Sequence, residues 1–124
     1  MGDKKLPGIA AGDIGKCAYV IFQRGHDLIG KTIGVAGEHL TGTEMAAAFT
    51  RALGEEVRYN DVSADVYRSL GFAGAEEGNP FQWERDFNEI HCGARKVETA
   101  RGLNPRLQTF DEWLAQNKSR IPLE

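Results

Sequence analysis

The sequence predicts a helix-rich α/β fold with a small parallel strand–helix–strand unit and two long helices towards its carboxy-terminal end. Several segments place apolar residues at helical spacing directly after a capping residue. Two short segments rich in β-branched residues flank one of these helices, which is typical of a crossover unit. A chain of 124 residues has the length of one domain. We therefore expect residues 1–124 to form a single domain.

The first half of the chain contains the strand–helix–strand unit. The expected elements are helix 14–24, strand 31–36, helix 42–53 and strand 56–60. Asp13 is expected to cap the first helix, and Gly25 to end it. The start of the second helix is well marked, because Thr41 and Glu44 have the spacing of a capping box. A third strand is expected only if the segment "PGIAA", residues 7–11, pairs with the other two.

The second half is predicted to be helical. The expected elements are helix 64–70, helix 80–100 and helix 110–118. Asn79 is expected to cap the long helix, with Pro80 at its first position and Gln82 completing a capping box. Its apolar stripe consists of Trp83, Phe87, Ile90, Ala94 and Val97. Thr109 and Glu112 repeat the capping-box pattern before the last helix.

The segment "GHDLIGKT", residues 25–32, matches the phosphate-loop pattern G-x-x-x-x-G-K-[ST]. A phosphate loop needs a strand before it and a helix that begins at the Lys-Thr pair, so that the helix amino terminus faces the anion. Here the sequence predicts a helix that ends at Gly25 and a strand that begins at Lys31, which is the reverse order. We therefore do not expect this segment to bind a nucleotide phosphate.

The composition excludes several function classes. The net charge of −3 and the scattered Lys and Arg residues predict no binding to nucleic acid. No segment approaches the roughly 18 apolar residues of a membrane span, so no membrane association is expected. The two cysteines, Cys17 and Cys92, fit no metal-binding spacing and are too few for a disulfide framework. These features predict a cytoplasmic protein without a metal site.

No residue is predicted to be catalytic or to bind a cofactor or metal. His91 and Cys92 look reactive together, but adjacent helical residues point about 100° apart, so His91 is poorly placed to activate the thiol. Two roles stay open for the aromatic side chains of the second half, stacking on a flat ligand or packing in the core. These side chains are Phe81, Trp83, Phe87 and Trp113. The weak candidates for a pocket or an interface are Ile14, Ile21, Ile33, Phe81, Trp83 and His91.

Four runs of the sequence carry a family resemblance. They are "GDKKLPGIAAGDIGK", "IGKTIGVAGEHLTGTEMA", "LGFAGA" and "LNPRLQTFDEWLAQNK". Together they resemble the carboxy-terminal part of NmrA-like proteins, which are atypical short-chain dehydrogenase/reductase relatives. The stretch "FQWERDFNE" is more polar than the resemblance leads us to expect.

The resemblance implies a lobe without its usual neighbour. In the family, an amino-terminal Rossmann half holds NAD(P) on a glycine fingerprint, and the carboxy-terminal part folds over it to form a ligand cleft and a partner surface. This sequence has no counterpart of that half, so no cofactor-binding position carries over. NAD(P) is expected only where a Rossmann half is present.

Two functions stay open. The first is a non-catalytic binding or interaction module, like the carboxy-terminal lobe of NmrA-like redox sensors. The second is a fragment of an NAD(P)-dependent reductase of a small molecule, active only with a Rossmann half. Both imply an exposed apolar surface on this chain. A Rossmann half, a protein partner or a second copy of the chain would cover this surface. We expect a homodimer or higher oligomer that buries the face including Ile14, Ile21 or Ile33.

Overall fold

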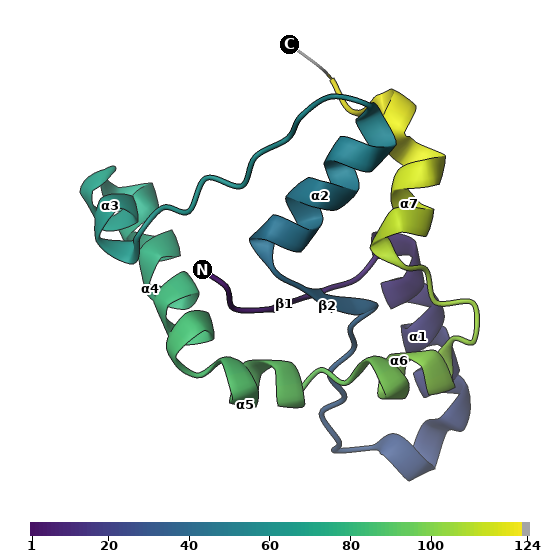
Figure 1. Ribbon diagram of the computed structural model, residues 1–124. Helices are drawn as coiled ribbons and strands as arrows, with labels where there is room; N and C mark the ends of the chain where they lie inside the picture. Colours follow the sequence, from purple (N-terminus) through teal and green to yellow (C-terminus); the bar gives the residue numbers. More distant parts are fainter. Residues whose placement is uncertain (123–124) are drawn as a thin grey trace.

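The computed structural model describes residues 1–122, without the side chains of 73–75 and 77 (Figure 1). The α-helices are α1 (Ala11–Arg24), α2 (Gly42–Leu53), α3 (Ala64–Ser69), α4 (Phe72–Asp86), α5 (Asn88–Gly93), α6 (Val97–Leu103) and α7 (Phe110–Asn117). Two 3-10 helices are η1 (Gly25–Leu28) and η2 (Lys118–Arg120), and the strands are β1 (Leu6–Gly8) and β2 (Glu38–Leu40). The chain is therefore helix-rich, as the sequence predicts.

The sheet differs from the prediction. β1 and β2 pair antiparallel, with Leu6 opposite Leu40 and Gly8 opposite Glu38, so the parallel strand–helix–strand unit is wrong. The optional strand at "PGIAA", residues 7–11, is found in part as β1, which begins one residue earlier, at Leu6, and ends at Gly8. α2 and α7 lie side by side next to this sheet, and α3 and α4 lie on its other side (Figure 1).

The two expected strands, 31–36 and 56–60, are extended segments without a ladder. At Gly34, a Cβ atom would lie 2.0 Å from the carbonyl oxygen of Ala94, so this segment packs backbone to backbone against the α5–α6 connection. At Val57, the backbone N–H donates to Oγ1 of Thr50, and the same hydroxyl donates to the Val57 carbonyl. Both segments thus satisfy their polar groups or pack closely without a strand partner.

The predicted long helix 80–100 is wrong. Its residues belong to α4, α5 and α6, with breaks at Phe87 and around Arg95. α4 begins at Phe72, so Pro80 lies inside the helix and not at its first position. The Oε1 of Gln82, expected in a capping box, instead accepts hydrogen bonds from Arg68 of α3. Tertiary contact between α3 and α4 therefore outweighs the local capping signal. Of the two expected carboxy-terminal helices, only the first is replaced by shorter ones.

The other helix predictions are confirmed to within a few residues. The capping boxes of α2 at Thr41 and α7 at Thr109 are both formed. α1 ends at Gly25, which has a φ of 51° that favours glycine. The N-cap of α1 is Ala10, so the expected capping role of Asp13 is wrong; this side chain is buried inside the first turn. No helix begins at Lys31 within the described residues, which supports the rejection of a phosphate loop.

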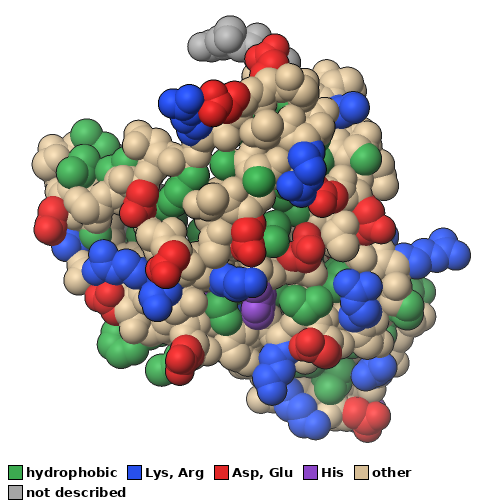
Figure 2. All heavy atoms as spheres, viewed as in Figure 1, with side chains coloured by type: hydrophobic (Ala, Val, Ile, Leu, Met, Phe, Trp, Pro, Cys, Tyr) green, Lys and Arg blue, Asp and Glu red, His purple; other side chains and the backbone are tan. Residues whose placement is uncertain are grey.

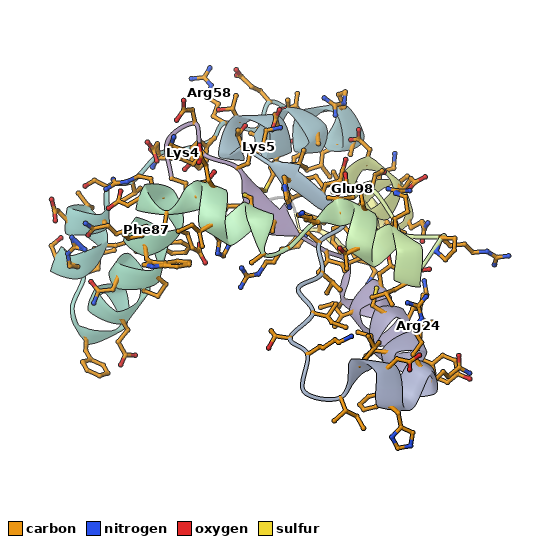
Figure 3. All side chains as sticks on the ribbon, turned by 90° about the horizontal axis from the view of Figure 1, so that it is seen from below. Lys4, Lys5, Arg24, Arg58, Phe87 and Glu98 are labelled. Carbon is orange, nitrogen blue, oxygen red and sulfur yellow. The ribbon has the colours of Figure 1, made fainter. Side chains whose placement is uncertain are left out.

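The main core lies between α1 and α6. Its buried members are Cys17, Ala100, Leu103 and Leu107, and the partly buried residues around them are Ile9, Val20, Ile21, Ile33, Val35 and Val97. Figure 3 shows α4, α5 and α6 in succession, with Phe87 on the arm formed by α4 and Arg24 at the far end of α1. The sheet therefore lies between α3 and α4 on one side and α1 and α6 on the other, next to α2 and α7 (Figure 1).

Candidate ligand-binding cavity

A cavity of about 340 Å³ opens beside the sheet. β1, β2, the start of α1, α2 and α7 all contribute to its wall. The lining residues are Leu6, Gly8, Ile9, Ala10, Ala11, Gly37, Glu38, Leu40, Met45, Gln108, Thr109, Phe110 and Trp113. Most of these side chains are apolar, and the size is that of a small-molecule site. This cavity is the candidate functional site.

One face of the two-stranded sheet forms the floor. Leu6 and Gly8 alternate with Pro7 along β1, and their partners Leu40 and Glu38 occupy the same face of β2. Because successive residues of a strand point to opposite sides, all four share the side that lines the cavity. The opposite face carries His39, whose Nε2 lies 2.7 Å from the carbonyl oxygen of Arg95. The sheet thus separates the cavity from the α5–α6 connection.

Two aromatic side chains of α7 line the cavity with their rings stacked on one another. The rings of Phe110 and Trp113 lie 6.3 Å apart at an interplanar angle of 6°, and both line the cavity. Phe49 of α2 meets Phe110 edge-on at 5.2 Å, which fixes the orientation of that ring. The capping box at Thr109 sets the start of α7 and with it the position of both rings.

Few polar groups face the cavity. Oε2 of Glu38 accepts a hydrogen bond from the backbone N–H of Phe110. The hydroxyl of Thr109 accepts from Glu112 N–H within the capping box, and the Thr109 N–H donates to the Glu112 carboxylate. Oε1 of Gln108, by contrast, is buried and has no hydrogen-bond partner among the residues that the structure describes. Because this oxygen has almost no exposed surface, it is not open to the cavity.

The backbone of Gln108 is fixed by a buried carboxylate. Oδ2 of Asp13 accepts from the Gln108 N–H at 2.8 Å, and Oδ1 accepts from Asn104 Nδ2 at 3.1 Å. Lys16 Nζ also donates to Oδ1, at 2.7 Å, from the surface side. The Asp13 side chain is fully buried. These bonds tie the first turn of α1 to the segment before α7.

Two opposing effects act on the pKa of Asp13. Desolvation is the largest and raises it, but the hydrogen bond from Lys16, the backbone N–H of Gln108, the charge of Lys16 and the amide of Asn104 lower it. Together they hold the pKa below its ordinary value of 3.8. Asp13 is therefore ionised at neutral pH, as a structural anchor and not as a proton donor.

None of the six residues singled out from the sequence lines the cavity. Ile21 and Ile33 pack against the main core, whereas Ile14 is 47% exposed on α1. Phe81 borders a separate, more polar hollow near Tyr67. Trp83 and His91 meet edge-on at 5.8 Å on α4 and α5. Sequence reasoning considered Trp113 as a stacking residue but missed Gln108, because no motif marks the residue before a helix cap.

His91 and Cys92 have separate surroundings. Nδ1 of His91 lies 3.2 Å from Arg95 Nη1, and Nε2 lies 3.8 Å from Glu84. Desolvation first, and then the charges of Arg95 and His39, lower the pKa of His91, while Glu84 opposes them. Desolvation raises the pKa of Cys92, whose Sγ lies 3.5 Å from the carbonyl oxygen of Lys5. A neutral imidazole and a protonated thiol with different partners do not form a nucleophile–base pair.

Two features are absent from the part of the chain that the structure describes, residues 1–122 without the side chains of 73–75 and 77. No group of three or more His, Cys, Asp or Glu side chains is arranged to hold a metal ion. In the same part of the chain, none of the helices has the length and hydropathy needed to cross a membrane. Lys and Arg side chains alternate with Asp and Glu over the face shown in Figure 2, without a large patch of one sign.

A comparison with known protein families shows which family the chain matches. The family model described as the NmrA-like family matches residues 1–114. The chain belongs to the NmrA-like family. The match confirms the resemblance seen in the four sequence runs. It also includes every residue that lines the cavity, from Leu6 to Trp113. The candidate site is therefore built from the NmrA-like part of the chain.

Proposed function

We propose that this NmrA-like chain is a binding module that holds a small, mainly apolar molecule in the cavity beside the sheet. The observation that carries this proposal is the cavity itself, with its apolar floor and its wall of Phe110 and Trp113. Sites of this kind gain affinity from buried apolar surface and orientation from a few polar groups. Within the family, the lobe would act as the ligand-facing and partner-facing part.

The chemistry of the lining residues supports binding over catalysis. The hydroxyl of Thr109 and the carboxylate of Glu38 have hydrogen-bond partners in the backbone of the chain. Glu38 is the one titratable side chain among the lining residues, so they do not contain an acid–base pair. We therefore propose that the isolated chain is not an enzyme.

We further propose that NAD(P) binds only where a Rossmann half is supplied. The sequence has no G-x-G-x-x-G pattern, which provides the backbone donors for a pyrophosphate. The alternative function, a fragment of an NAD(P)-dependent reductase of a small molecule, requires the same supply. The free thiols of Cys17 and Cys92 support a cytoplasmic location for either function.

The partner that we propose first is a second copy of this chain. Ile14, Tyr19 and Phe22 are exposed large hydrophobic residues of α1, and Phe22 is 83% exposed. Ile14 and Phe22 are eight residues apart and so share a helix face. Because Ile21 and Ile33 pack against the core of the same chain, we assign the interface to Ile14 and Phe22. A Rossmann half or another protein would be the alternative cover.

The cavity proposal is tested by filling the cavity. Gly8 lies on the sheet face that forms the floor, and a Cβ atom there would meet nothing within 4 Å. Gly8→Leu therefore places a side chain in the cavity without backbone strain. Loss of binding of a small apolar probe would support the proposed site. Unchanged binding would contradict it.

A further inference from the structure

We infer that copies of this chain associate through unlike faces, the α1 face of one copy against a stripe on α4 and α5 of another. The α1 face is the exposed side of that helix with Ile14 and Phe22. The α4–α5 stripe consists of Trp83, Phe87 and Ile90. The inference rests on the proposed self-association and names the surface that α1 meets in the second copy.

The exposed apolar side chains are gathered in two parts of the molecule. Ten large hydrophobic residues are exposed in the part of the chain that the structure describes. Four of them lie in residues 11–37 and the other six in residues 64–93. Large apolar surfaces of this kind mark interaction sites more often than single exposed residues do.

The two parts carry opposite net charge. The acidic arm is residues 64–93, which form α3, α4 and α5 and contain six Asp and Glu but two Arg. The basic arm is residues 11–37 and 94–107, which surround the main core and contain seven Lys and Arg but three Asp and Glu. An ion pair removes one charge of each sign, so ion pairs within an arm leave its excess unchanged. The acidic α3 and α4 and the basic α1 and α6 lie on opposite sides of the sheet (Figure 1).

The α4–α5 stripe exposes aromatic rings among acidic side chains. The rings of Trp83 and Phe87 lie 5.8 Å apart, and both side chains are half exposed. Ile90 follows Phe87 by three residues and is also exposed. Glu84 and Asp86 are the sequence neighbours of these rings. The stripe is therefore an apolar surface with an acidic border.

The α1 face adjoins a hollow that suits such rings. The hollow has a volume of about 570 Å³ and lies between α1 and the residues that follow α6. Its lining includes Gly15, Tyr19 and Leu103. A Cβ atom at Gly15 would meet nothing within 4 Å, so a side chain of another copy can approach the helix closely. Gly15 and Phe22 are seven residues apart and lie on the same side of α1.

The charges favour a contact between unlike faces. Lys16 and Arg106 also line the hollow, whereas Glu84 and Asp86 border the stripe. If one α1 face met another, cations would meet cations, and two stripes would bring carboxylates together. Between α1 and the stripe, opposite charges meet around an apolar centre. Two copies can form this contact twice around a two-fold axis.

The test mixes two variants of the full chain, each with one altered face. Phe22→Lys alters the α1 face, and Phe87→Lys alters the stripe. By light scattering after size exclusion, each variant alone should lie closer to the monomer mass than the wild-type chain. Mixed in equal amounts, they should form a dimer with one copy of each, because each supplies the face that the other lacks. Phe72→Lys, at the far end of α4 from Phe87, should associate like the wild type.

Two further measurements guard the result. Circular dichroism shows whether each variant is folded, and Ile90→Lys alters the stripe independently if Phe87→Lys is not. Raising sodium chloride from about 0.05 M to about 0.5 M should weaken the wild-type assembly, because salt screens attraction between opposite charges. A contact between like faces would instead become stronger.

The outcomes separate this inference from the self-association it rests on. A mixture that stays monomeric would overturn the pairing of α1 with the stripe, and so would stripe variants that associate like the wild type. Association that strengthens in high salt would overturn it as well. In each of these cases the wild-type chain still associates. A wild-type chain with the monomer mass at all concentrations would contradict self-association itself, and the inference with it.

Discussion

The carboxylate of Asp13 and the backbone N–H of Gln108 form a buried hydrogen bond of 2.8 Å between residues 95 positions apart in the chain. The bond joins the first turn of α1 to the segment that leads into α7. Both ends of this connection border the cavity, through Ala11 on one side and Gln108 on the other. Asp13 therefore holds the cavity together although it does not line it.

Asp13→Asn should destabilise the chain strongly. Asparagine cannot accept from Gln108 N–H, Asn104 and Lys16 as a carboxylate does, and its amide would face the Asn104 amide. We expect the free energy of unfolding at pH 7 to fall by about 2–4 kcal/mol, as for lost bonds to a buried charged group. Urea denaturation of this variant and of the exposed control Asp27→Asn measures it. A loss of unfolding free energy no larger than that of the control would contradict the role of Asp13 as an anchor.

The same anchor predicts a pH dependence in acid. Because the pKa of Asp13 is lowered on folding, its contribution is present above the ordinary value of 3.8 and is lost as the pH falls through the lower folded value. The difference in unfolding free energy between the wild-type chain and Asp13→Asn should therefore shrink below pH 3.8. A difference that stays constant from pH 7 into this range would show that the carboxylate charge is not responsible.

His91 predicts a second pH dependence, nearer to neutrality. Its pKa is lowered from the ordinary value of 6.5, mainly by desolvation and by Arg95 and His39, with Glu84 opposing. The unfolded chain then binds the proton more readily, so stability should decrease as the pH falls below 6.5. Comparing urea midpoints at pH 7.5 and pH 5.5, we expect a smaller decrease in His91→Gln than in the wild-type chain. His26→Gln, an exposed control, should behave like the wild type.

The sequence could predict helices whose signals are local. The starts of α2 and α7 follow from capping boxes at Thr41 and Thr109, and these contacts involve residues three positions apart. Tertiary contacts override the local signals elsewhere. Gln82 binds Arg68 instead of capping its own helix, and Thr50 binds Val57 where a strand partner was expected.

The cavity could not be predicted for the same reason. Its wall combines β1, β2, α2 and α7, and their arrangement depends on the antiparallel pairing of Leu6 with Leu40. Asp13 illustrates the limit, because its position suits a helix cap but its partner Gln108 lies near the other end of the chain. A family resemblance predicted a ligand cleft, but it named no residue of this chain in it.

The dinucleotide proposal predicts that the isolated chain binds neither NADPH nor ATP. Calorimetric titration at micromolar protein should give no heat of binding with either nucleotide, because no helix begins at Lys31 within residues 1–122 to face a phosphate. Micromolar binding of NADPH would contradict the proposal that a Rossmann half is needed. Binding of ATP that is lost in Lys31→Ala would revive the phosphate loop.

The self-association proposal predicts a concentration-dependent oligomer. Light scattering after size exclusion should show more than the monomer mass at micromolar concentrations, and Phe22→Lys should shift the chain towards the monomer. Phe72 is similarly exposed on α4, at 81%, so Phe72→Lys is a matched control that should leave the mass unchanged. A folded wild-type chain with the monomer mass at all concentrations would show that α1 carries no such interface.

The central claim, that this NmrA-like lobe binds a small molecule beside its sheet, is tested most directly by the affinity of indole for Gly8→Leu and Gly102→Leu. A Cβ atom at either glycine meets nothing within 4 Å, but Gly8 lines the cavity and Gly102 lies on α6 outside it. Nuclear magnetic resonance titration should give wild-type affinity for Gly102→Leu and at least about a tenfold loss for Gly8→Leu, since a leucine side chain would occupy the site. Equal affinities of the two variants for indole would contradict the claim.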